Sequence, residues 1–96
     1  MKYTFHPHAE KELEEIESYY DDTDEELGIR FREEFKTTLS RILKFPNAWQ
    51  PLSKVNRRCQ LNDFPYGIIY RIESNAIYVL AVTHLRRKSD YWTYRI

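Results

Sequence analysis

Side chains that bind phosphate, exchange protons or stack on bases are concentrated near the end of the chain. They follow an apolar run and are His84, Arg86, Arg87, Lys88, Tyr91 and Trp92. Guanidinium groups bind phosphate oxygens in bidentate fashion, and an imidazole exchanges protons near neutral pH. Aromatic rings stack on nucleobases. The cluster therefore fits phosphate chemistry, nucleic-acid binding or recognition of carboxylates on a protein partner, and it equally fits ordinary surface charge.

Two further arginines are expected on neighbouring strands. Side chains alternate between the two faces of a strand, so the side chains of Arg58 and Cys59 are expected on opposite faces of the sheet. In a register that turns Cys59 toward the helices, Arg58 and Arg71 meet on the other face of the sheet. We expect His84, Arg86 and Arg87 to reach the same site from the end of the last strand. Such a set would hold phosphate through guanidinium groups and move a proton through the imidazole.

The bulk composition indicates one small domain, residues 1–96, with no metal and no cofactor. Cys59 is the only cysteine, which excludes an intrachain disulfide and a zinc site built from several thiols. No apolar run approaches the roughly 20 residues that cross a bilayer. We therefore expect a cytoplasmic protein without membrane contact, and the sequence leaves its oligomeric state open.

The net charge of zero conceals an uneven distribution. Residues 1–48 hold 12 acidic and 7 basic residues, whereas residues 49–96 hold 3 acidic and 8 basic ones. If the two halves form different surfaces, the basic surface attracts phosphate groups or an acidic partner. The alternative is that these charges mix on folding and are simply solvated.

Two amphipathic helices are predicted in the first half. Pro7 suits a first helical turn, and apolar residues at spacings of three and four predict a helix over residues 7–21. Thr23 and Glu26 have the spacing of a capping box, which starts a second helix near residue 24. Pro46 ends it. The short connection predicts an antiparallel helical hairpin, in which Gly28 marks a close approach of the two backbones.

The second half has the pattern of strands. Residues 57–61, 66–73 and 76–83 are rich in Ile, Val and Tyr, and Ser74-Asn75 is short enough for a hairpin turn. Residues 2–6 form a further short strand. The predicted fold is α+β with the order β-α-α-β-β-β, a mostly antiparallel four-stranded sheet carrying the hairpin on one face. A short helix or irregular tail follows, and the other face is open or covered by a partner.

Other residues of chemical interest are given structural roles. His6 and His8 flank Pro7 at a helix start, where they cap the helix or face solvent because no third metal ligand is near in sequence. Cys59 is expected in the core, since no His/Asn set surrounds it. The glutamates of the first helix are expected to form a solvated face.

The chain resembles the RelE/ParE superfamily of toxins from type II toxin–antitoxin modules, the proteins often labelled plasmid stabilisation factors. The resemblance covers nearly the whole chain. Its most specific parts are Arg57-Arg58, Phe64-Pro65-Tyr66, Tyr70-Arg71-Ile72, the segment 81–87 and Tyr91-Trp92. It implies a toxin held inactive by a cognate antitoxin. RelE-like members resemble metal-independent endoribonucleases that cleave ribosome-bound mRNA, whereas ParE-like members resemble inhibitors of DNA gyrase.

The RelE-like interpretation assigns candidate catalytic roles to particular residues. The resemblance maps them to Arg58, Arg71, His84 and, as terminal tyrosine, Tyr91, for which Tyr94 is an alternative. Lys54 is the only counterpart of the lysines that some nucleases place before the second strand. The nucleic-acid or antitoxin-binding residues expected from the same comparison are Lys54, Arg57, Arg58, Arg71, Arg86, Arg87, Lys88 and Trp92.

Three functional hypotheses result. The incomplete nuclease set and the H-x-R-R ending favour a ParE-like growth inhibitor that binds DNA gyrase or another host target. The alternatives are a RelE-like enzyme acting on ribosome-bound mRNA and a degenerate toxin that only binds its antitoxin.

Overall fold

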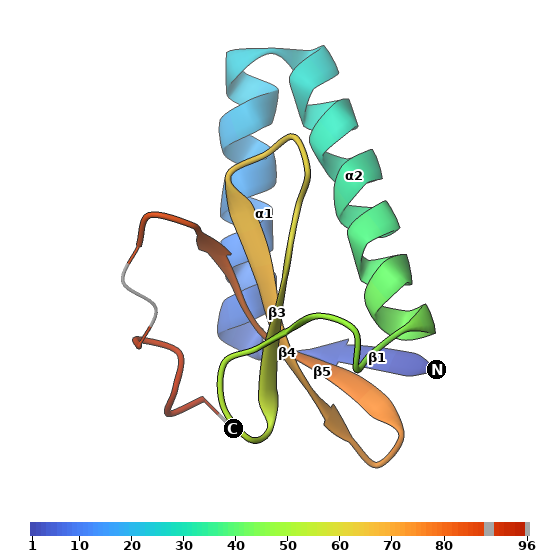
Figure 1. Cartoon of the computed structure of the whole chain (residues 1–96). Helices are drawn as coiled ribbons and strands as arrows, with labels where there is room; N and C mark the ends of the chain where they lie inside the picture. The colour runs from blue at the N-terminus through green and yellow to red at the C-terminus, as the bar shows by residue number, and fades with distance from the viewer. Residues whose placement is uncertain (88–89, 96) are drawn as a thin grey trace.

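A computed structural model describes residues 1–87 and 90–95. Its elements, in chain order, are β1 (Lys2–Phe5), α1 (Pro7–Thr23), α2 (Glu25–Lys44), β2 (Gln50–Pro51), β3 (Asn56–Gln60), β4 (Tyr66–Glu73) and β5 (Ala76–His84). Figure 1 shows the two helices as a hairpin on one side of the sheet. The predicted α+β class, the helical hairpin and the three strands predicted in the second half are confirmed.

The sheet has five strands in the order β1-β5-β4-β3-β2, not the predicted four. The additional strand, β2, has two residues, and Gln50 pairs with Arg58. A two-residue strand has no alternation that a sequence pattern could reveal. The sheet is mixed, because β1 runs parallel to β5 while the other neighbours are antiparallel. Ser74 and Asn75 form the β4–β5 turn with positive φ angles of 49° and 61°, the backbone that this tight hairpin requires.

The main core lies between the helical hairpin and the sheet. The helices contribute the apolar stripes seen in the sequence, with Ala9, Ile16, Tyr20, Phe31, Phe35, Leu39 and Ile42 all buried. These pack against one face of the sheet, including Ile68, Tyr70, Ile77, Val79 and Val82. The buried residues repeat about every 3.6 positions in the helices and every two positions in the strands. Both element types could therefore be predicted from the spacing of apolar residues.

The connection between the helices differs from the predicted capping box. Asp24, not Thr23, is the N-cap of α2, and its carboxylate accepts a hydrogen bond from the Glu26 N–H at 2.9 Å. Thr23 belongs to the last turn of α1, where its hydroxyl donates to the Tyr19 carbonyl at 2.8 Å. Two residues with good capping side chains are adjacent here, and the extension of α1 to Thr23 decides between them.

Gly28 does mark a close approach of the helices, but to a side chain and not to a backbone. A Cβ placed on Gly28 would lie 1.9 Å from a carboxylate oxygen of Asp21 in α1. Asp21 in turn forms an ion pair with Arg32 of α2. Because Gly28 has no side chain, the Asp21 carboxylate can occupy the space beside it and reach Arg32 on the other helix.

A β-bulge in β5 changes which face its last residues share. Ile69 pairs with Ala81 and Tyr70 with Val79, so Leu80 is the extra residue. As a result Leu80 and Ala81 both lie on the face away from the helices, in a second apolar cluster. Residues after the bulge are turned over relative to simple alternation.

The face away from the helices is partly covered by the chain itself. Trp92 is 4% exposed and packs with Ile69, Leu80 and Ala81. Residues 90–94 form turns that bring Trp92 to this position. The predicted irregular tail is thus a second packing layer, and this part of the sheet is neither open nor left for a partner.

Candidate functional site

Arg58 and Arg71 lie on the same face of the sheet, away from the helices. Arg58 pairs with Ile69, and Arg71 is two residues further along β4. Diagonal neighbours of this kind have Cα atoms about 7–8 Å apart. Their guanidinium groups have separate partners, however: Arg58 donates to the Gln50 side-chain oxygen at 3.0 Å, whereas Arg71 pairs with Glu73 and lies 5.3 Å from the Tyr78 ring centroid.

His84 does not join these arginines, contrary to the sequence-based expectation. It pairs with Tyr66, at the other end of β4 from Arg71. Five residues of strand separate the two positions, roughly 17 Å. The bulge at Leu80 also turns His84 to the helix side, where its ring meets the Tyr66 ring with centroids 5.2 Å apart. Arg71 and His84 therefore cannot act on one phosphate group in this arrangement.

The hydrogen bond at the His84 ring fixes its neutral tautomer. Nδ1 accepts from the Arg86 backbone N–H at 3.1 Å, so the proton of the neutral ring is on Nε2. A general base that accepts a proton on Nε2 needs the other neutral tautomer, with its proton on Nδ1. The contact therefore suits a structural role in the turn after β5.

Tyr91, the candidate terminal tyrosine, is packed between two arginines. The guanidinium carbons of Arg87 and Arg95 lie 3.8 Å and 5.0 Å from its ring centroid. Burial raises the pKa of the Tyr91 hydroxyl, which works against its ionisation near neutral pH. This placement holds Tyr91 as part of the C-terminal packing.

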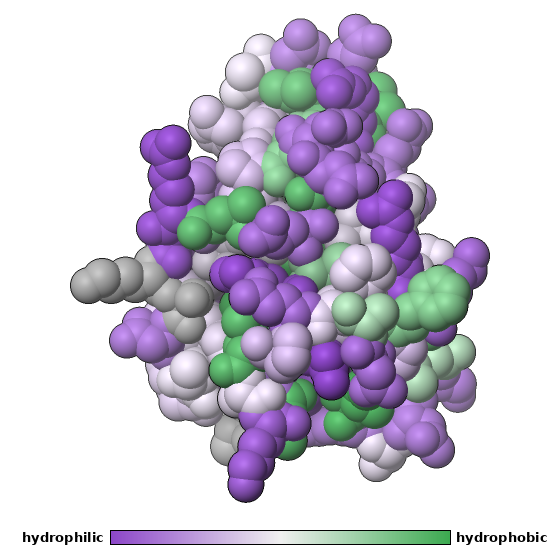
Figure 2. Space-filling view, in the orientation of Figure 1, coloured by the Kyte–Doolittle hydropathy of each residue, from purple (hydrophilic) through white to green (hydrophobic). Residues whose placement is uncertain are grey.

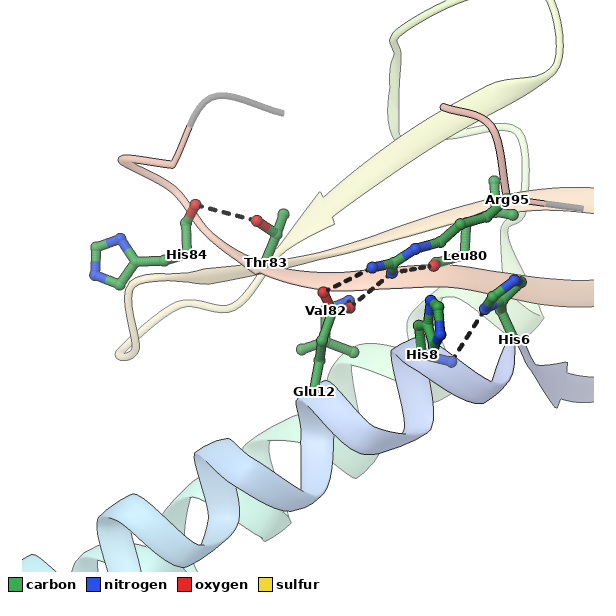
Figure 3. A network of polar contacts seen from close by, with 8 residues as sticks. All are labelled: His6, His8, Glu12, Leu80, Val82, Thr83, His84 and Arg95. Carbon is green, nitrogen blue, oxygen red and sulfur yellow. Dashed lines mark hydrogen bonds and ion pairs between the residues drawn. The ribbon is translucent and has the colours of Figure 1, made fainter. Parts of the chain in front are cut away.

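An ion pair that the sequence did not reveal fastens the C-terminal segment to α1. Both Arg95 terminal nitrogens donate to Glu12, at 2.9 Å and 3.1 Å, and one also donates to the Leu80 carbonyl at 2.9 Å. Glu12 accepts a further hydrogen bond from the Val82 N–H at 3.1 Å. Figure 3 shows this network, with Glu12 reaching the edge of β5 beyond the short β1.

One signal for this network was available in the sequence. Glu12 is three residues after Ala9 and four before Ile16, so it lies within the apolar stripe of α1 and not on the solvated face. Arg95 had no comparable signal, because the last residues have no periodicity. Nearby, burial first and the Arg95 charge second lower the pKa of His6, whose Nδ1 accepts from the His8 N–H at 3.0 Å and caps α1.

Several residues predicted to bind a partner have other environments. Trp92 is buried, as described above, so it is not available for stacking on a base. Arg57 faces the helix side, and its guanidinium donates to the backbone carbonyls of Asn47 and Trp49 at 3.1 Å and 2.8 Å. These contacts order the loop before β2.

The remaining predicted binding residues differ in what the structure says of them. Lys54, Arg86 and Arg87 are exposed, and Lys88 lies outside the described residues. Figure 2 shows polar and charged residues over most of the visible side, with smaller apolar areas between them.

A groove of about 190 Å³ runs between α1 and the end of β5. Its lining combines two acidic residues with aromatic rings and His84: Glu12, Glu15, Ile16, Tyr19, Tyr66, Val82, Thr83, His84 and Arg87. Glu12 is already paired with Arg95, and Arg87 also lines the groove, so Glu15 and the aromatic rings are what this surface offers a partner. It suits a mainly apolar peptide segment more than a phosphate. Within residues 1–87 and 90–95, no three His, Cys, Asp or Glu side chains are grouped so that they could hold a metal ion.

Cys59 lies in the core at 3% exposure, as the sequence predicted. Burial raises the pKa of its thiol from 9.0 to about 11. At pH 8 the folded protein should therefore contain about a hundredfold less thiolate than an unperturbed cysteine. We expect iodoacetamide to modify native Cys59 very slowly and the urea-unfolded chain rapidly, as followed by mass spectrometry. Equal rates in the two states would contradict this assignment.

Comparison with known proteins identifies the group to which the chain belongs. The sequence model of the ParE toxin of the type II toxin–antitoxin system parDE matches residues 3–89. The chain belongs to the ParE toxin family. Toxin ParE2 of Mycobacterium tuberculosis, in the CDC 1551 / Oshkosh and H37Rv strains, is 38% identical over 80 residues, which cover 82% of this chain and 76% of that protein.

A solved structure supports the fold of this ParE-type toxin. The chromosomal ParDE toxin–antitoxin system from P. aeruginosa contains a chain that superposes with a TM-score of 0.73 at 15% identity, covering 88% of this chain and 95% of that one. Membership of a type II toxin–antitoxin family implies a cognate antitoxin as partner. No helix in the described part of this ParE-type chain is long and apolar enough to span a membrane.

Proposed function

We propose that this ParE-type toxin inhibits growth by binding a host protein, DNA gyrase, and that its cognate antitoxin neutralises it by binding the toxin directly. The RelE-like alternative needs Arg58, Arg71 and His84 on one substrate. The observation that carries the proposal is the separation of His84 from Arg71 by both strand length and sheet face. Binding needs no such convergence, so it is the activity that this arrangement supports best.

Two features provide surface for such binding. The exposed Arg86 lies two residues after the end of β5, and the groove between α1 and β5 is lined by charged and aromatic residues. The two surfaces differ in character, because the groove is mixed and rich in aromatic rings whereas the chain after β5 is basic. We assign the groove to antitoxin side chains and the basic segment after β5 to the host target.

Substitution of His84 separates the two mechanisms. We expect His84→Gln to leave growth inhibition unchanged when the toxin is induced without antitoxin, because a glutamine oxygen can accept the Arg86 N–H in place of Nδ1. A nuclease that used the imidazole for proton transfer would lose about 10²–10⁴-fold in activity. The matched control is His8→Gln, since His8 is an exposed histidine outside both surfaces.

The target is tested with purified components. Supercoiling by gyrase should fall with added toxin and recover with added antitoxin, while ribosome-bound mRNA stays intact. Cleavage of that mRNA in the presence of a chelator would instead support the RelE-like enzyme. A tight antitoxin complex with neither effect, and no toxicity, would identify a degenerate toxin and sink the proposal.

A further inference from the structure

A notch interrupts the sheet edge where β2 begins. Gln50, the first residue of β2, pairs with Arg58, and β3 continues past this point through Cys59 and Gln60, which pair with no strand of the described residues on that side. The hollow at this edge has a volume of about 290 Å³. Its lining comes from the end of α2, the β2 edge and β3: Arg41, Trp49, Gln50, Arg58, Cys59, Gln60 and Asn62.

The lining carries two positive charges and no carboxylate. Besides Arg41 and Arg58 it contains three amide side chains, whose N–H groups can donate hydrogen bonds. At about 290 Å³ the hollow is at the small end of ligand sites, which suits a compact anion and not a whole nucleotide.

Among the residues that the structure describes, Arg58 is held in place without a negative partner. Its guanidinium donates to the neutral Gln50 side chain at 3.0 Å, and its Nε is buried without a hydrogen-bond partner among the described residues. Its stem lies across Gly67, where an added Cβ would be 3.1 Å from Arg58 Cδ. A cation fixed in this way and partly removed from water is more stable beside an anion.

Arg41 is likewise not neutralised along its own helix. The residues one turn away are Thr37, Thr38 and Lys44 of α2 and its C-cap Phe45, none of them acidic. Within the described residues, the ion pairs with carboxylates are made by Arg32, Arg71 and Arg95, and none includes Arg41 or Arg58. Glu33, Glu34 and Asp63 line an adjoining hollow with Arg41, so these carboxylates are the competitors for its guanidinium.

We propose that this notch is a binding site for a terminal phosphate group, with Arg41 and Arg58 as the cationic ligands and the amides of Gln50, Gln60 and Asn62 as further donors. Guanidinium forks match phosphate oxygens, and two of them offset the double charge of a phosphate monoester. The site is distinct from the divergent Arg58 and Arg71 pair considered above, because Arg41 approaches from α2. It does not depend on which host protein the toxin inhibits.

The test follows the arginine side-chain NMR signals and calorimetric heat during titration with inorganic phosphate at constant ionic strength. We expect saturable shifts at Arg41 and Arg58, and an affinity reduced about tenfold or more in Arg41→Gln and in Arg58→Gln, each having lost one charge-assisted contact. The matched control is Arg86→Gln, which removes an exposed arginine elsewhere. Asp63→Asn should strengthen phosphate binding. Because loss of folding cannot raise affinity, this variant tests the site even if the arginine variants are destabilised.

The source of the phosphate is distinguished by two further ligands. A single-stranded oligonucleotide carrying a 5′-phosphate is compared with the same strand lacking it. Tighter binding of the phosphorylated strand, lost in Arg41→Gln, identifies a nucleic-acid end, while equal binding of the two strands together with retained phosphate binding identifies a free phosphate. Absence of saturable shifts at both arginines, or equal losses in Arg86→Gln, would overturn the proposal.

Discussion

Trp92→Ala is expected to lower the free energy of unfolding by about 3–5 kcal/mol, the usual cost of removing a buried aromatic side chain. Trp92 is 4% exposed and covers the apolar cluster of Ile69, Leu80 and Ala81. Tyr78 and Tyr91 also pack against this cluster but are only partly buried, so Trp92 is its one fully buried aromatic side chain among the described residues. Urea unfolding monitored by circular dichroism measures the change, because loss of one side chain leaves the secondary structure signal intact.

The control separates packing from direct binding. Tyr94 is also aromatic and close in sequence but 72% exposed, so Tyr94→Ala should change stability by less than about 0.5 kcal/mol. Trp92→Phe should recover a large part of the loss. If Trp92→Ala instead folds with unchanged stability and binds antitoxin more weakly, Trp92 is a contact residue, as the sequence alone suggested.

The parts of the fold that could be predicted are those in which one periodicity persists over several turns. Apolar stripes run along α1 and α2, helices of 17 and 20 residues, and β4 was placed at its observed ends. Pro65 before Tyr66 and Pro46 after α2 fixed boundaries through their backbone geometry. By contrast, β2 depends on a pairing between distant residues, which local spacing does not contain.

The expected meeting of His84 with Arg58 and Arg71 depended on the register of β5 as well as on distance along the sheet. Simple alternation along β5 places His84 on the same face as Tyr78, away from the helices. The bulge at Leu80 shifts this by one residue, so His84 instead pairs with Tyr66 on the helix side. A bulge in an uninterrupted apolar run leaves no local signal, because either face accepts the same residue types.

The sequence did carry an overlooked sign that both faces are covered. Between residues 77 and 82, β5 has no charged side chain, whereas a strand with one solvated face alternates apolar and polar residues. From the sequence we expected this face to be open or covered by a partner, whereas residues 90–95 of the chain itself cover part of it. What the pattern cannot give is which segment provides the cover, since the tail has neither periodicity nor a turn motif.

The second large effect is expected from breaking the ion pair between Glu12 and Arg95. Their side chains are 17% and 6% exposed, so the pair is largely removed from water. Arg95→Ala leaves Glu12 as an uncompensated charge and frees the Leu80 carbonyl, and we expect a loss of about 3–5 kcal/mol in the free energy of unfolding. Equilibrium denaturation in urea measures it.

A double-mutant cycle shows whether the two residues act as a unit. Glu12→Gln keeps an oxygen that can accept from the Val82 N–H, so it removes the charge while preserving the edge contact of β5. If the pair fastens the C-terminal segment, the double variant should lose clearly less stability than the sum of the two single variants. Additive losses would mean that Arg95 contributes mainly through Leu80 and the Tyr91 ring. Because solvent ions screen a largely buried pair weakly, the coupling should also persist at high salt, unlike that of the exposed Asp21–Arg32 pair.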